Sequence, residues 1–86
     1  MDSYASSGKQ SVMSGNENIV SVFAGNLRKV RLEKGRSQEQ LAHECGIDRS
    51  YISGCERGVR NPSLKMLGKL ANALGVEAKI FLDGDC

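Results

Sequence analysis

The sequence predicts an all-α fold of five helices. After residue 18, apolar residues recur at spacings of three and four, which is the period of one face of an α-helix. Glycines follow these stretches, and glycine can adopt the left-handed conformation that ends a helix. No stretch has the pattern of a strand. A chain of 86 residues that is 40% hydrophobic and 26% charged fits one small globular domain. We expect this compact domain over residues 18–82, followed by a polar tail, 83–86.

The first helix is predicted over residues 18–34. Its apolar positions are spaced by three and four: Val20, Phe23, Leu27 and Val30. Gly35 then ends the helix. Residues 1–17 are rich in Ser, Gly, Asn and Gln and have no apolar period, so we expect a disordered extension there.

Two short helices joined by a sharp turn are predicted between residues 37 and 58. Ser37 and Gln40 have the spacing of a capping box, and the first helix runs from about 38 to 45. Gly46 ends it, and Ile47 fills the turn. The buried face of this first helix is expected to comprise Leu41, Ala42 and Cys45.

The second helix of the pair begins after Asp48, whose side-chain oxygen can cap it. Its buried positions are predicted to be Tyr51, Ile52 and Cys55. Helices this short cannot bury their apolar faces alone, so a larger helical domain must surround them. The segment Arg49-Ser50-Tyr51 then starts the second helix at the surface. A polar helix start that carries arginine is typical of helices that enter a DNA major groove.

Two further helices complete the predicted fold. Pro62 disfavours helix at the residue before it, Ser63 can cap a fourth helix, and Gly75 ends that helix. The buried stripe of the fourth helix is predicted to be Leu64, Leu67, Leu70, Ala71 and Leu74. A brief fifth helix or turn is expected to contain Val76, Ile80, Phe81 and Leu82.

The charge is uneven along the chain. Residues 18–76 hold ten Lys or Arg and five Asp or Glu, whereas the two ends together are acidic, which gives the net charge of +2. A basic middle between acidic ends favours a polyanionic partner, although a solvated basic surface would have the same composition. No apolar run approaches a membrane span, and the N-terminus shows no signal-peptide core. We therefore expect a cytoplasmic protein.

The residues that carry chemistry are sparse. Cys45, Cys55 and Cys86 form no CxxC pair, and His43 lies near Cys45 alone, which disfavours a zinc site. Cys45 and Cys55 are interpreted as reduced, buried thiols, and Cys86 as exposed. His43 has no nucleophile or base at a plausible spacing, and there is no glycine-rich phosphate loop. We expect no enzyme, no metal, no cofactor and no small-molecule ligand.

A resemblance covers residues 22–82. SQEQLA, followed by CGIDRSYISGCERGVRNPSLKMLGKLANALGV, resembles the Cro/C1-type helix-turn-helix domain of phage repressors, Cro and xenobiotic-response-element (XRE) regulators. The resemblance implies a five-helix, lambda-repressor-like domain. Within the family, IDRSYISGCERGVRN is most similar to the controller proteins of restriction–modification systems. Those proteins are small dimers that regulate their own operon, through contact with RNA polymerase or its exclusion.

The resemblance implies two sets of DNA-contacting residues. The candidates for reading bases are Arg49, Ser50, Tyr51 and Ser53. The candidates for binding phosphates are Gln38, Arg57, Arg60 and Asn61. The planar fork of Arg49 matches O6 and N7 of guanine. Tyr51 is open to two roles, packing at the motif's rim or reaching DNA, and Ser53 faces a base edge or a phosphate. Gly54 is expected to leave the middle of the helix bare, which gives DNA shape more weight.

Two further expectations concern assembly and stability. The resemblance implies a largely buried ion pair between Arg31 and Glu56. An apolar C-terminal stripe on so small a domain favours a partner copy. The residues expected in this dimer contact are Leu74, Val76, Ile80, Phe81 and Leu82.

The sequence is interpreted as a homodimeric transcriptional regulator that binds a near-palindromic operator in double-stranded DNA. Two alternatives remain open. One is an antitoxin of the same fold, which a neighbouring toxin gene would indicate. The other is a protein-interaction module of this fold that lacks DNA binding.

Overall fold

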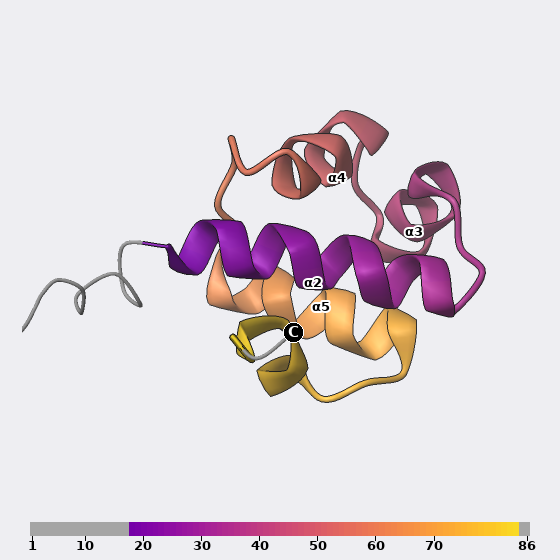
Figure 1. The fold of residues 1–86 in the computed structure, drawn as a ribbon. Helices are drawn as coiled ribbons and strands as arrows, with labels where there is room; N and C mark the ends of the chain where they lie inside the picture. The colour runs from indigo at the N-terminus through magenta and orange to yellow at the C-terminus, as the bar shows by residue number, and fades with distance from the viewer. Residues whose placement is uncertain (1–17, 85–86) are drawn as a thin grey trace, which may run out of the picture.

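Helix α2 (Ile19–Glu33) runs through the middle of the fold. The computed structural model describes residues 18–84 of the chain. In the view of Figure 1, helices α3 (Gln38–Cys45) and α4 (Arg49–Glu56) lie above α2. Helix α5 (Leu64–Leu74) passes behind α2, and the 3-10 turn η1 (Ala78–Leu82) lies below it. Helix α2 packs against α4 and η1, and α3 packs against α4 and α5.

The helix boundaries follow from caps that the sequence predicts. The Ser37 hydroxyl accepts from the backbone N–H of Gln40 at 3.0 Å, and the Gln40 side chain accepts from the backbone N–H of Ser37 at 2.8 Å. Ser63 caps α5 in the same way by accepting from the backbone N–H of Met66 at 3.0 Å. Gly46 ends α3 in the left-handed conformation, with φ of 69°. The predicted boundaries of α3, α4 and α5 are therefore confirmed.

The core lies between α2 and the helices around it. Every helix contributes apolar side chains to one buried cluster: Phe23, Leu27, Val30, Leu41, Ala42, Cys45, Ile52, Cys55, Leu67, Leu70, Ala71, Leu74 and Phe81. Phe23 and Phe81 meet edge to face, with ring centroids 5.9 Å apart. This contact holds the C-terminal turn against the first half of α2.

A buried amide also holds the C-terminal turn. The side-chain nitrogen of Asn26 donates to the backbone carbonyl oxygens of Phe81 at 3.0 Å and Asp83 at 2.9 Å. Asn26 is 5% exposed, and it lies on the apolar side of α2. Its two hydrogen bonds satisfy a polar group that would otherwise be costly to bury.

Two expectations about the helices need correction. The described residues form four α-helices and a 3-10 turn, where five helices were predicted. Residues 78–82 form a 3-10 turn, in which the backbone N–H of Ile80 donates to the carbonyl oxygen of Glu77, three residues back. Leu64 is 86% exposed, because it begins α5 one turn before Leu67 reaches the core.

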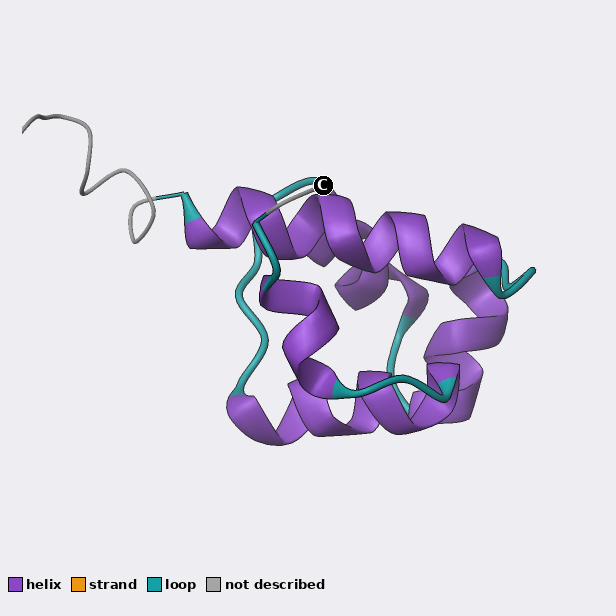
Figure 2. Cartoon of the chain, turned by 60° about the horizontal axis from the view of Figure 1, so that its bottom comes forward, coloured by secondary structure: helices purple, strands orange, loops and turns teal. Residues whose placement is uncertain are grey.

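The all-α class is confirmed, and Figure 2 shows only helices and connecting loops between residues 18 and 84. No helix in this described range is long and apolar enough to cross a membrane. The expected disorder of residues 1–17 and the expected exposure of Cys86 fall outside the described residues.

Candidate nucleic-acid interface

The turn between α3 and α4 presents the first residues of α4 to solvent. After Gly46, the backbone N–H of Ile47 donates to the carbonyl oxygen of Ala42 at 2.9 Å, and the Ile47 side chain packs against the core. The Asp48 carboxylate then caps α4 by accepting from the backbone N–H of Ser50 at 2.9 Å and from its hydroxyl. These bonds, that of the hydroxyl first, hold the pKa of Asp48 below its ordinary value. The carboxylate is therefore charged and remains a good cap at neutral pH.

The side chains expected to read bases do not share one environment. Arg49 is exposed, and within residues 18–84 its guanidinium makes no hydrogen bond or ion pair to a side chain, although its charge helps to lower the pKa of the neighbouring Asp48 carboxylate. Ser50 is also exposed, although its hydroxyl donates to Asp48. Tyr51 is half-buried, and Ser53 accepts a hydrogen bond from Arg57 Nε at 3.3 Å. Arg49 thus has the freest donors of the four.

Tyr51 and Arg60 lie together. The Tyr51 side chain packs against the core, and the Arg60 guanidinium carbon lies 5.2 Å from the centre of its ring. Sequence reasoning placed Tyr51 among base readers and Arg60 among phosphate ligands, without a contact between them. The pairing depends on how the loop after α4 folds back, which residue spacing does not reveal.

Gly54 is buried and is not a bare surface in the middle of α4. A Cβ atom at this position would lie 3.3 Å from Arg60 Cβ and 3.4 Å from Arg60 Nε. The prediction that Gly54 leaves the middle of the helix open is therefore corrected, because the Arg60 side chain covers it.

The expected phosphate ligands differ in exposure and in whether their hydrogen-bond donors are already used within the protein. The Gln38 amide donates to Glu56 Oε1 at 3.1 Å, so part of its donor capacity serves the fold. Arg57, Arg60 and Asn61 are exposed, at the end of α4 and in the loop that follows. All three lie within five residues of α4, where they can flank whatever the helix binds.

A buried ion pair fixes the orientation of α4. Arg31 Nε lies 2.6 Å from Glu56 Oε2, and the second contact, from the Arg31 Nη2 atom to Glu56 Oε1, is 3.0 Å. The two side chains are 7% and 3% exposed. Arg31 also donates to the carbonyl oxygen of Arg36 at 2.7 Å. The pair that the family resemblance implies is thus present, and it joins α2, the start of α3 and the end of α4.

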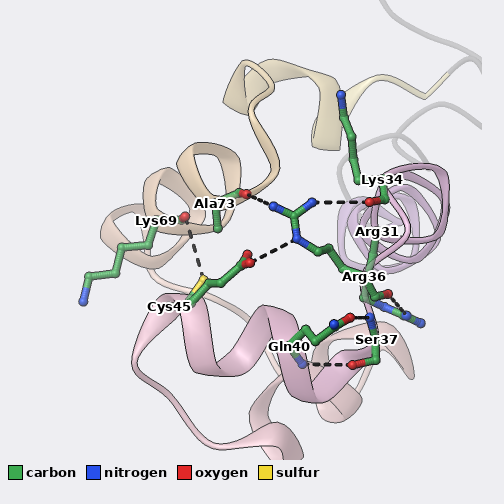
Figure 3. Close-up of polar contacts among 9 residues, drawn as sticks. Arg31, Lys34, Arg36, Ser37, Gln40, Cys45, Lys69 and Ala73 are labelled. Carbon is green, nitrogen blue, oxygen red and sulfur yellow. Dashed lines mark hydrogen bonds and ion pairs between the residues drawn. The ribbon is translucent and has the colours of Figure 1, made fainter.

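Arg36 makes a second set of links that sequence reasoning missed. Figure 3 shows its guanidinium between the end of α2, α3 and α5. It donates to Glu44 Oε2 at 3.1 Å and to the carbonyl oxygens of Lys34 at 3.3 Å and Ala73 at 3.4 Å. A lone arginine between a helix-ending glycine and a cap gives no sequence signal for such contacts.

The expected dimer stripe is divided between core and surface. Leu74 is 2% exposed and Phe81 is fully buried, so both belong to the chain's own core. These two side chains are therefore not available for the expected dimer contact. Ile80 and Leu82 remain 44% and 43% exposed, and Val76 is partly buried.

Cys45 and Cys55 are buried thiols in the core. Cys45 and Cys55 are free, and burial is the main cause that raises the pKa of each thiol. The Cys45 thiol points at the carbonyl oxygen of Lys69, 3.8 Å away (Figure 3). Between residues 18 and 84, no group of three or more His, Cys, Asp or Glu side chains could hold a metal ion.

An exposed, arginine-bearing helix start supported by a second short helix is the geometry of helix-turn-helix DNA-binding regulators. The chain belongs to the helix-turn-helix family HTH_3, whose model matches residues 27–81. The control protein C.BamHI from Bacillus amyloliquefaciens is 47% identical over 74 residues, which cover 80% of this chain and 91% of that protein.

Solved structures give the same assignment. The restriction–modification controller protein C.AhdI from Aeromonas hydrophila is 48% identical, with a TM-score of 0.70 over 72% of this chain and 94% of that chain. The controller protein C.Esp1396I has been solved as a tetramer in complex with its natural 35 base-pair operator. It is 41% identical, with a TM-score of 0.67 over 73% of this chain and 83% of that one. The chain is thus a helix-turn-helix transcriptional regulator similar to controller proteins.

Proposed function

We propose that the chain binds a near-palindromic DNA operator as a homodimer and regulates transcription as the controller protein of a restriction–modification system. The observation that carries the proposal is the free guanidinium of Arg49 on the exposed first turn of α4. Five donors in a planar fork can bind O6 and N7 of one guanine. The operator complex of the similar C.Esp1396I supports the same use of this fold.

The remaining contacts are proposed to position the protein on the phosphate backbone. Ser50 and Ser53 have hydroxyls that can meet a base edge or a phosphate, and Arg57 and Asn61 lie just beyond the C-terminal end of α4. Gln38 can use the amide hydrogen that Glu56 does not accept. Phosphate contacts fix the register and contribute affinity without reading sequence.

The proposed dimer contact is the exposed part of the C-terminal stripe, which comprises Val76, Ile80 and Leu82. A two-fold axis there would place two copies of α4 about one DNA turn apart, roughly 34 Å. Dimerisation is tested by sedimentation of Ile80→Glu, with Leu32→Glu as the control because Leu32 is an exposed residue of α2. We expect the first variant alone to become monomeric. A monomeric wild type would contradict this interface.

The DNA-binding proposal is tested by selecting bound fragments from a random DNA pool and measuring affinities by fluorescence anisotropy. Arg49→Ala should weaken binding to the selected operator by roughly 5- to 150-fold, the loss for one bidentate base contact of about 1–3 kcal/mol. Lys79→Ala is the charge-matched control, since Lys79 is 85% exposed on η1, across α2 from α4 (Figure 1), and within residues 18–84 pairs only with the exposed Glu77. Because Lys79 adjoins the proposed dimer residue Ile80, sedimentation must first show that this variant is still dimeric.

Two results would decide against the proposal. One is the absence of any selected sequence from the pool while the protein is folded, which would favour the protein-interaction alternative. The other is an equal loss of affinity for Arg49→Ala and Lys79→Ala. The regulatory step, contact with RNA polymerase or its exclusion, is tested by transcription in vitro from a promoter that contains the selected site.

A further inference from the structure

The loop after α4 is anchored on Gly54. Gly58 has a φ of 78°, which turns the chain back at the end of the helix. The backbone N–H of Val59 then donates to the carbonyl oxygen of Gly54 at 3.0 Å. One residue later, the Arg60 side chain lies over Gly54, where a Cβ atom would be only 3.3 Å from Arg60 Cβ. Both the backbone and the side chain of the loop therefore rest on the same residue of α4.

The far end of Arg60 rests on Tyr51. Its guanidinium carbon lies 5.2 Å from the ring centre, within the range of a cation–π contact. Tyr51 precedes Gly54 by three residues, so the two lie on one face of α4. Arg60 reaches the ring by crossing the space that a side chain at residue 54 would occupy. We call this arrangement of Tyr51, Gly54 and Arg60 the Arg60 stack.

The Arg60 stack limits the freedom of the Tyr51 ring. The ring packs against core side chains and also lies against the Arg60 guanidinium. An exposed cation–π contact favours the stacked state by roughly two- to fivefold. A ring held in one orientation can offer its edge and hydroxyl to a single base step, whereas a mobile ring would contact several steps equally.

We propose that Arg60 is a positioning residue for Tyr51, and that the Arg60 stack sets sequence discrimination as well as affinity. This inference rests on the proposed operator binding. It adds a second role for Arg60, which the family resemblance assigns only to phosphate binding. Gly54 becomes a specificity determinant through its missing side chain. A purely phosphate-binding Arg60 would instead change the affinity for all sequences by the same factor.

Gly54→Ala is the sharpest perturbation. It keeps every charge and polar group, and alanine favours a helix interior over glycine, so the helix is not weakened by propensity. The added Cβ atom must push Arg60 away by a few tenths of an ångström, because a contact of 3.3 Å with Arg60 Cβ is tighter than ordinary packing. Arg60→Gln removes the cation directly. Arg57→Gln is the matched control, since Arg57 lies at the start of the same loop and contacts Ser53 instead of Tyr51.

The experiment measures affinity for the selected operator and for copies with single base-pair changes. A mismatched pair ordinarily lowers affinity by roughly 5- to 150-fold. At the positions where Tyr51→Leu loosens discrimination, we expect Gly54→Ala and Arg60→Gln to reduce that penalty by at least about threefold. Arg57→Gln should weaken binding to all copies alike. Uniform weakening by all three variants would overturn the proposal and leave Arg60 as a phosphate ligand.

A measurement without DNA tests the stack itself. In proton NMR spectra of the free protein, the Tyr51 ring current should shift the Arg60 side-chain methylenes upfield. This shift should vanish in Tyr51→Leu, become smaller in Gly54→Ala and persist in Arg57→Gln. Unshifted Arg60 methylenes in the wild type would overturn the stack. Failure of the wild type to bind any DNA would instead overturn the proposed function first, and the positioning role with it.

Discussion

Removal of the Glu56 carboxylate tests the buried ion pair directly. Glu56→Ala deletes three hydrogen bonds at once, two from Arg31 at 2.6 and 3.0 Å and one from Gln38 at 3.1 Å. The Arg31 guanidinium would stay behind with a side chain 7% exposed in the present packing. The Arg36 carbonyl oxygen, 2.7 Å away, would be its remaining partner. The variant therefore leaves a buried charge without its counter-ion.

The expected loss is comparable with the whole stability of the domain. Breaking a buried pair by removing one partner costs about 3–5 kcal/mol. At about 0.05–0.15 kcal/mol per residue, a domain spanning residues 18–84 has roughly 3–10 kcal/mol of stability. We therefore expect Glu56→Ala to be largely unfolded or to melt far below the wild type. A loss of 3 kcal/mol alone corresponds to about 12–24 °C in Tm for a domain of this size.

The assay is thermal and urea unfolding followed by far-UV circular dichroism, with Glu44→Ala as the control. Glu44 also pairs with an arginine, Arg36 at 3.1 Å, but the two side chains are 32% and 37% exposed. An exposed pair contributes about 0–1 kcal/mol, so this control should melt within about 8 °C of the wild type. Both variants remove one carboxylate, and burial is the main difference between them.

One result would refute the reasoning. If Glu56→Ala melts as high as Glu44→Ala, the buried pair does not stabilise the fold. The double variant Arg31→Met, Glu56→Leu gives a further check, because replacing both charges with apolar side chains avoids an unpaired charge. It should recover a large part of the stability that Glu56→Ala loses.

Three other predictions follow from buried or capping groups. Asn26→Ala should lower the free energy of unfolding by about 1–3 kcal/mol in urea titrations, because the buried Phe81 carbonyl loses its donor; unchanged unfolding would contradict this role. The pKa of Asp48 is lower in the folded protein than its ordinary value of 3.8, so the charged carboxylate stabilises the fold at pH values above 3.8. This stabilisation is lost as the pH falls through the lower pKa of the folded state. Asp48→Asn should therefore lose less Tm than the wild type on acidification below about pH 4, and parallel curves would count against the cap. In a Cys86→Ser background, Cys45 and Cys55 should react with Ellman's reagent only as the protein unfolds, since burial raises their pKa; fast reaction of the native protein would show otherwise.

Local chemistry made the helices predictable from sequence. Ser37, Asp48 and Ser63 cap the helices that follow them, and Gly46 and Gly75 end helices in the left-handed conformation. Each of these signals acts within about four residues, so spacing alone locates it. For the same reason, the exposed start of α4 could be identified before its packing was known.

Contacts between distant segments explain what sequence reasoning missed. Asn26 bonds to a carbonyl 55 residues away, and Arg36 reaches Ala73 across 37 residues. The burial of Phe81 depends on the same docking of the C-terminal turn against α2. The cover that Arg60 places over Gly54 depends on the path of a loop. No periodicity or spacing reports such contacts, because they arise only after the helices pack.

The position of the Arg31–Glu56 pair has a consequence for redesign. Glu56 is the last residue of α4, and its ion pair with Arg31 ties the helix to α2. Arg49 lies seven residues earlier and makes no bond to either member of this pair within residues 18–84. The part that sets the angle of the helix is thus separate from the side chain best placed to meet a base. Residue 49 can therefore be substituted to change which DNA sequence the protein binds without altering the packing of α4. Most variants in a library of substitutions at residue 49 should still fold.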